Sequence, residues 1–251
     1  MKILGTRRTR SVLDFSCSFE QTSRVPSRAR APRPTSRRRA PREPAPDRIL
    51  SAALAAFAAR SFDGATTREI AADADVPQGL LSYHYASKQA LWKAAVDWVF
   101  GELAADLASA TEALRDVDPA TRLRSVLKRF VRFSAAHPEL HRFMVHEGSH
   151  DGPRLRWLLD RHIRSLFETS TALIRAAAPD ADAEHLHYMI LGAATHLFAV
   201  APEFQRLTGR DPFAADMVEA QASAVVDSLI DAALAQKSTP RATAARARSK
   251  R

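Results

Sequence analysis

The amino-acid sequence predicts an all-α protein across residues 47–236. Ala and Leu dominate this stretch, and runs of β-branched residues are absent. Apolar residues recur three or four positions apart, which is the spacing of one face of an α-helix. Residues that cap or break helices stand between these apolar stretches. The pattern therefore favours a series of helices rather than a sheet.

Residues 47–100 carry the start and stop signals of four helices. The clearest is Thr66-x-x-Glu69, a capping box in which two side chains satisfy backbone amides at a helix start. Pro77 cannot continue that helix, because proline lacks the amide that a helix interior requires. The predicted helices are residues 48–60 after an Asp47 cap, residues 66–75, residues 78–85, and a long helix after a Ser87 cap.

The C-terminal half shows further helix starts. Asp118-Pro119 places an N-cap before a proline at the first helical position, where the missing amide is tolerated. Asp180, Asp182 and Glu184 crowd another start, where the helix dipole favours acids. The predicted helices are one from 119, one over 138–148, one that opens at 151–153, one over about 182–200, and one over 212–236.

The charge divides the chain into three parts. Residues 1–46 hold 12 Lys and Arg against three acids, residues 237–251 hold six against none, and residues 47–236 carry a net charge of −6. Segments this polar bury too little surface to offset their ordering entropy. We therefore expect a disordered basic arm over 1–46 and a disordered basic tail over 237–251. The arm either contacts nucleic acid or stays solvated, and a start codon downstream is the third alternative.

The composition also excludes several classes of protein. The single Cys permits no intrachain disulfide, which favours a reducing compartment and a cytoplasmic location. The apolar runs are too short for a membrane-spanning helix, and the N-terminus lacks the apolar segment of a secretory signal. No nucleophile elbow, phosphate-binding loop or metal motif is present, so we expect neither an enzyme nor a cofactor.

Three short helices and a long one outline a helix-turn-helix domain over residues 47–100. A tight turn at 74–77 joins the second and third helices. Ala71 and Val76 place a small and an apolar side chain where the two helices approach closely. In such a domain the second helix of the pair lies in the DNA major groove. Residues 101–236 would form a separate, larger helical bundle.

The stretch from 62 to 92, FDGATTREIAADADVPQGLLSYHYASKQALW, resembles the DNA-binding domain of the TetR family of bacterial transcriptional regulators. The matching motifs are G-x-T-T-R-E-I-A, D-V-P-Q, G-L-L-S-Y-H-Y and S-K-x-A-L, and their spacing fits the family without an alignment gap. The segments HPELHRFMVHEGSHDGPRLRWLLDRH and GAATHLFAVAPEFQRLTGRDP resemble C-terminal halves of family members, so the resemblance covers about 47–236. It implies a three-helix DNA-binding unit followed by a helical ligand-binding and dimerisation unit.

Ten residues are candidate DNA contacts. Hydroxyls and helix amides suit phosphates, Gln and Ser side chains read base edges, glycine lets the backbone approach, and leucine contacts a thymine methyl. The resemblance implies that Lys88 contacts a phosphate. The candidates are Thr66, Thr67, Arg68, Gln78, Gly79, Leu80, Ser82, Tyr83, His84 and Lys88.

Some side chains in this region have a plainer interpretation. Leu81 is expected in the core rather than at DNA, whereas Leu80 fits either role. Tyr85 is expected to pack against the first helix. Arg68 and Glu69 fit a solvated helix face as well as a DNA contact.

Two features bear on affinity and specificity. Residues 47–100 carry five basic and six acidic side chains, although affinity for duplex DNA rests largely on phosphate neutralisation. We therefore hypothesise that the arm over 1–46 supplies the missing positive charge. The turn has Asp75 where the family usually has Gly, and the recognition helix has Ser82 where Tyr is frequent, which leaves the operator sequence open.

The predicted bundle over 101–236 carries aromatic and His side chains that either fill its core or line an effector cavity. His137 and His141 have the helical spacing of metal ligands, but no third ligand accompanies them, so we expect no metal. The candidate effector-binding residues are Phe133, His137, Phe143, Glu147, Trp157, His162, Tyr188 and His196.

The last two predicted helices are rich in small side chains, which permit close helix approach. In the TetR family this pair forms a four-helix dimer interface, so the resemblance implies a homodimer that presents two recognition helices to a pseudo-palindromic operator. We expect a repressor that binds double-stranded DNA. An unidentified small-molecule effector would release it from the DNA. The alternatives are a helical interaction module whose helix-turn-helix no longer binds DNA, and an enzyme.

Overall fold

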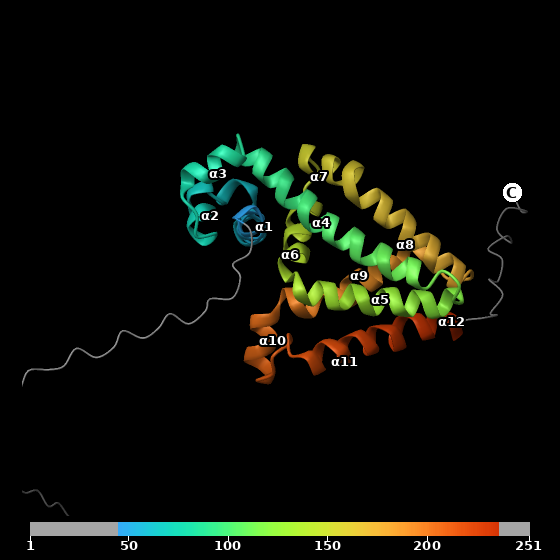
Figure 1. The fold of residues 1–251 in the computed structure, drawn as a ribbon. Helices are drawn as coiled ribbons and strands as arrows, with labels where there is room; N and C mark the ends of the chain where they lie inside the picture. Colours follow the sequence, from blue (N-terminus) through green and yellow to red (C-terminus); the bar gives the residue numbers. More distant parts are fainter. Residues whose placement is uncertain (1–44, 236–251) are drawn as a thin grey trace, which may run out of the picture. The chain divides into compact units, whose positions relative to one another are not determined.

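The structure is a computed structural model that describes residues 45–235, and every regular element in that range is a helix (Figure 1). The predicted all-α fold is therefore confirmed for these residues. The predicted tail over 237–251 lies outside the described residues, as does the predicted arm over 1–46 except for its last two positions. Within 45–235, no helix is both long and apolar enough to cross a membrane.

The helices follow one another with short connections. Two π-helical stretches, η1 (Leu159–Ile163) and η2 (Val226–Asp231), continue the helices that precede them. The α-helices are α1 (Ala45–Gly64), α2 (Thr67–Asp73), α3 (Gln78–His84), α4 (Lys88–Ala113), α5 (Pro119–Ala136), α6 (Pro138–Gly148), α7 (Pro153–Leu158), α8 (Arg164–Ala177), α9 (Ala183–Ala199), α10 (Ala201–Thr208), α11 (Ala215–Val225) and α12 (Ala232–Ala235).

Four N-caps are present, and three of them, Thr66, Ser87 and Asp118, were predicted from the sequence. In each, a side-chain oxygen accepts a hydrogen bond from the backbone amide three residues later, which satisfies a donor that the helix leaves unpaired. The pairs and their donor–acceptor distances are Glu69 to Thr66 at 3.3 Å, Ala90 to Ser87 at 3.0 Å, Thr121 to Asp118 at 3.0 Å, and His185 to Asp182 at 3.0 Å.

The beginning and end of α1 differ from the prediction. The predicted Asp47 cap is wrong, because α1 begins at Ala45 and Asp47 lies in its first turn. Pro46 accounts for the earlier start, since proline suits the first turn of a helix. The helix also continues past residue 60, but Ser61 interrupts it with φ 57° and ψ 177°. The chain therefore changes direction just before Phe62.

The region after α9 also differs from the prediction. α10 occupies a stretch where only a connection was expected, and α11 begins at Ala215 rather than at 212. Gly209 ends α10 with a left-handed φ of 69°. The Asp211 carboxylate accepts a hydrogen bond from the amide of Phe213 at 3.0 Å. Such local bonds favour a turn over a helix, which explains the later start of α11.

Buried apolar side chains form two clusters. The first joins α1 to α4 with α6 and α7, and the second joins α5, α8, α9, α11 and η2. Trp92 of α4 lies in the first cluster together with Phe143 and Leu158, all at most 1 % exposed. The buried core therefore does not end at residue 100, where the sequence suggests a domain boundary. α1 packs directly against both α4 and α6.

Candidate nucleic-acid interface

α2 and α3 form the helix pair that the sequence predicts, and their common core fixes the orientation of α3. Leu81 is 1 % exposed and lies in the same buried cluster as Ile70 and Ala71 of α2. The core role predicted for Leu81 is therefore confirmed. Tyr85 is half-buried against the same cluster, and burial followed by the nearby Asp47 carboxylate raises its pKa.

The turn between α2 and α3 explains an unusual residue. The amide of Val76 donates to the carbonyl of Ala71 at 3.0 Å, which draws the chain back across the end of α2. Asp75 has a φ of 52°. This left-handed conformation favours glycine, and Asp is one of the few other residues that tolerate it. Asp75 thus occupies a glycine position without a change of turn.

The candidate DNA contacts remain accessible on this helix pair. Tyr83 is the most exposed large apolar residue of the described chain, with 84 % of its surface free. Seven candidates are exposed, namely Thr66, Arg68, Gln78, Gly79, Ser82, Tyr83 and His84. Three candidates are half-buried, namely Thr67, Leu80 and Lys88.

Short contacts link the first turns of α2 and α3. The Gln78 amide donates to the Thr67 hydroxyl at 3.4 Å. The Thr66 hydroxyl donates to the Glu69 carboxylate at 2.8 Å, and this bond, together with the Arg60 charge, lowers the pKa of Glu69. Two polar side chains that could reach base edges or phosphates are therefore adjacent across the helix pair.

Lys88 is held at the start of α4. Its ammonium donates to the backbone carbonyl of Asp63 at 3.2 Å and lies 4.8 Å from the centroid of the Phe62 ring. These two contacts hold the ammonium against the end of α1. A phosphate that binds this ammonium must therefore approach the corner where the end of α1 meets the start of α4.

Acidic side chains offset part of the basic charge around the helix pair. The Arg60 guanidinium lies 3.8 Å from a Glu69 carboxylate oxygen and 3.9 Å from one of Asp73. The positive charge of Arg60 is therefore offset by carboxylates of the same domain. The five basic and six acidic side chains of residues 47–100 leave little net attraction for a phosphate backbone.

Four candidate effector-binding residues lie around Trp92. The Trp92 ring centroid is 5.8 Å from that of Phe143 and 5.4 Å from that of Trp157. Trp157 in turn lies 5.6 Å from the ring of His162. Glu147 lies in the same region, where it is 5 % exposed and pairs with Arg154 at 2.9 Å.

The other four candidates lie elsewhere. Phe133 stacks on His137, with ring centroids 4.3 Å apart. Tyr188 and His196 are exposed on α9. The structure therefore does not bring the eight candidates into one site. Within residues 45–235, no three His, Cys, Asp or Glu side chains are grouped so that they could hold a metal ion.

A groove of about 670 Å³ lies where α9, α10 and α11 meet. His196 is the one predicted effector residue that lines it. Sequence reasoning missed the others, and four of those lie on α10, which was not expected. His141 lines the groove and hydrogen-bonds through Nδ1 to the Thr195 hydroxyl at 2.9 Å. Burial, followed by the nearby His196, lowers the pKa of His141.

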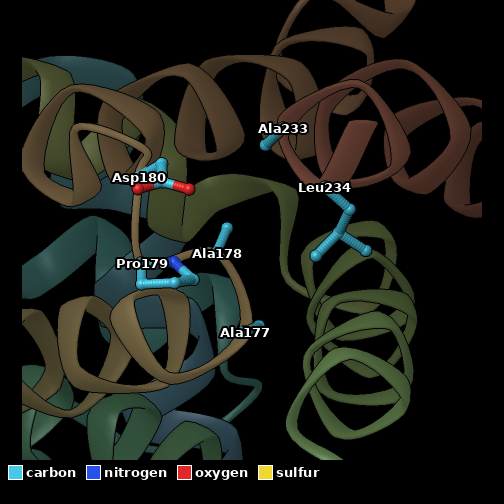
Figure 2. A pocket seen from close by; sticks show the side chains of 6 residues that line it. All are labelled: Ala177, Ala178, Pro179, Asp180, Ala233 and Leu234. Carbon is cyan, nitrogen blue, oxygen red and sulfur yellow. The ribbon is translucent and has the colours of Figure 1, made fainter. Parts of the chain in front are cut away.

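A second depression is too small for an organic effector. It lies between the turn after α8 and α12, and its volume of about 10 Å³ is close to that of a single water molecule (Figure 2). Its lining residues are Ala177, Ala178, Pro179, Asp180, Ala233 and Leu234.

The chain is similar to known regulators along most of the described length. It is 28 % identical over 166 residues to the HTH-type transcriptional regulator RutR of Escherichia coli (strain K12), which covers 64 % of this chain and 77 % of that relative. RutR of Shigella flexneri matches with the same identity and coverage.

Solved structures share the fold. The ketosteroid transcriptional regulator KstR2 of Mycobacterium tuberculosis gives a TM-score of 0.61 at 16 % identity, over 76 % of this chain and 96 % of that chain. A TetR-like transcriptional regulator from Rhodococcus sp. RHA1 gives a TM-score of 0.57 at 22 % identity, over 79 % and 100 %.

Two family matches correspond to the two parts of the chain. Residues 49–95, which contain the α2–α3 pair, match the family described as bacterial regulatory proteins, tetR family. Residues 119–229 match the family described as tetracyclin repressor-like, C-terminal domain. The chain therefore belongs to the TetR family of bacterial helix-turn-helix transcriptional regulators, which are DNA-binding proteins and not enzymes.

Proposed function

We propose that this regulator is a homodimeric repressor that binds a pseudo-palindromic operator and leaves it when a small-molecule effector binds. The observation that supports DNA binding is that α3 has one buried side and one exposed side. Leu81 anchors α3 in the core, whereas Ser82, Tyr83 and His84 remain exposed. A bacterial regulator of this kind meets the chromosome in the cytoplasm, which is the location that we propose.

Surface features of α9 support the homodimer. Tyr188 is 68 % exposed and Met189 is 45 % exposed, and the groove with α10 and α11 continues this surface. Exposed apolar patches of this kind commonly mark protein interfaces. Gly192 adds no side chain, so a second α9 could approach closely. A two-fold dimer would present one α3 to each half of the operator.

The surroundings of Trp92 support an effector site. The indole Nε1 is buried and finds no hydrogen-bond acceptor within residues 45–235. An unsatisfied buried donor is costly, so an effector that brings a carbonyl or another acceptor would be stabilised there. We propose that Phe143, Glu147 and Trp157 contribute to the same site. The sequence candidates His196 and Tyr188 belong instead to the proposed dimer surface.

The first experiment is the selection of genomic DNA fragments by the purified full-length protein at two salt concentrations. We expect a pseudo-palindrome that is still recovered at the higher salt concentration. Sequence-independent binding that disappears at high salt would contradict an operator-specific repressor. It would favour the alternative, a helical interaction module whose basic ends alone attract DNA.

The effector site has a separate test. Trp92→Phe removes the indole N–H and keeps an aromatic ring in the core. Compounds suggested by the genes beside the operator are screened for release of the DNA fragment. The variant should bind the operator like the wild type but respond at least tenfold less to the effector. Unchanged release by the effector would show that the effector binds elsewhere.

A further inference from the structure

Two cations share one aromatic ring at the corner between α1 and α4. The Lys88 ammonium lies 4.8 Å from the centroid of Phe62, and the Arg154 guanidinium carbon lies 4.7 Å from the same centroid. The face of an aromatic ring attracts cations, so both contacts are favourable. The two positive groups also repel one another, so the position of each affects the other.

Arg154 reaches this ring from α7 and is fixed by a buried partner. Its Nε donates to both carboxylate oxygens of Glu147, at 2.9 and 3.2 Å. Glu147 is 5 % exposed, and a buried carboxylate strongly favours a paired geometry. Direct contacts therefore run from Glu147 of α6 through Arg154 and Phe62 to Lys88 at the start of α4.

The backbone before Phe62 is strained. Ser61 has φ 57° and ψ 177°, a conformation that is essentially restricted to glycine. Strain of this kind is retained only where the surrounding structure imposes it, and it is frequent at functional positions. Here it turns the chain so that the Phe62 ring lies between α4 and α7.

We propose that Arg154 is a positioning residue for DNA binding, which sets the place of the Lys88 ammonium through the Phe62 ring. This inference rests on the proposed role of Lys88 as a phosphate contact. Arg154 shares the ring with Lys88 and repels it, so it weakens the hold of Phe62 on the ammonium. Without Arg154, Phe62 holds the ammonium more tightly, and the ammonium gives up part of its phosphate contact.

The same contacts offer a route for the effector response. α7 carries both Arg154 and Trp157, and Trp157 packs on Trp92. A ligand that displaces Trp157 would also move Arg154 away from Phe62. The first consequence would be a weaker Lys88 contact, before any larger movement of α4.

The test compares the full-length wild type with Arg154→Met, Lys88→Gln and the double variant on the operator fragment. Affinity is measured over a range of salt concentrations. Arg154→Met should weaken binding roughly 3- to 30-fold, the range expected for residues that act through a neighbour. In the Lys88→Gln background, the same change should have little further effect. Arg156→Met, an exposed change of the same charge on the same helix, is the matched control.

The outcomes separate the two proposals. Additive losses in the double variant would show that Arg154 does not act through Lys88. Wild-type affinity of Lys88→Gln would overturn both the phosphate contact and the positioning role. A loss in Lys88→Gln with none in Arg154→Met would overturn the positioning role alone. If Arg154→Met folds poorly, the double variant Glu147→Gln/Arg154→Gln takes its place, because the two amides can still hydrogen-bond to each other. Its loss of DNA affinity must likewise be non-additive with the loss caused by Lys88→Gln.

Discussion

Leu81 and Ser82 are neighbours in α3 with opposite environments. The Leu81 side chain is 1 % exposed, whereas Ser82 is exposed. This difference follows from the helical period, because successive side chains point about 100° apart around the axis. The helix thus separates the residue that holds it in place from the residue that can read a base. Ser82 can therefore be replaced without disturbing the core contact of Leu81.

A pair of substitutions tests that separation. Leu81→Ala should lower the free energy of unfolding by about 2–5 kcal/mol, because it leaves a cavity in a packed core. Ser82→Ala should change it by less than about 0.5 kcal/mol, as is usual at the surface. Urea denaturation measures both. Ser82→Ala should instead alter the preferred base at one position of each half-site, and equal stability losses in the two variants would contradict the assignment.

At the scale of elements, the α2–α3 turn sets the angle between the helix pair. Its backbone needs a left-handed residue at Asp75, where φ is 52°. Glycine meets this need without steric cost, whereas Asp meets it through its tolerance of that region. The turn geometry, rather than the identity of the residue, is therefore what the fold requires.

Two variants at this position isolate the backbone effect. Asp75→Gly and Asp75→Ala both remove the carboxylate, so their difference reports the left-handed conformation alone. We expect the Gly variant to be more stable than the Ala variant by about 1–2 kcal/mol. Thermal or urea unfolding of the two proteins measures this difference. Equal stabilities would mean that the turn changes conformation to accommodate alanine.

At the scale of the whole molecule, three half-buried histidines make stability depend on pH. Burial lowers the pKa of His141, His162 and His187, although Asp97 partly opposes this for His162. These rings therefore take up protons at a lower pH in the folded protein than in the unfolded chain, where the ordinary pKa is about 6.5. The unfolded state therefore binds more protons in that window, so stability falls as pH drops.

Urea denaturation between pH 7.5 and 5.5 tests this expectation. The wild type should lose stability steadily below about pH 6.5. A triple variant with Asn at these three positions should show a shallower loss, whatever its absolute stability. A slope that is the same in both proteins would assign the pH dependence to other groups.

The basic ends give a second prediction for the whole chain. Residues 1–44 hold 12 basic and three acidic side chains, against five and six in residues 47–100. Removal of 1–44 should reduce the salt dependence of DNA binding, because fewer counterions are released. The recovered operator sequence should stay the same. Removal of 237–251 is the control for a basic end, and an unchanged salt slope after loss of 1–44 would refute the hypothesis.

Features that depend on neighbours along the chain were predictable from the order of residues. The caps at Thr66, Ser87 and Asp118 were predicted because the donor and acceptor lie three residues apart. The helix-turn-helix was predicted because its turn and its apolar spacing are local. The family resemblance rests on the same continuous stretch. Local chemistry of this kind is written directly in the order of residues.

Contacts between distant segments, by contrast, follow from the packing of the folded chain and from no local pattern. The partners in the Phe62–Arg154 and His141–Thr195 contacts are far apart in the sequence, and no periodic pattern indicates that they meet. α10 was missed because it is short. The cap that was expected at Asp211 forms a turn instead of starting the next helix. Which aromatic residues gather around Trp92 and which remain exposed on α9 depends on packing of the whole chain. Side-chain burial is a property of the folded assembly of helices, so the sequence order alone does not specify it.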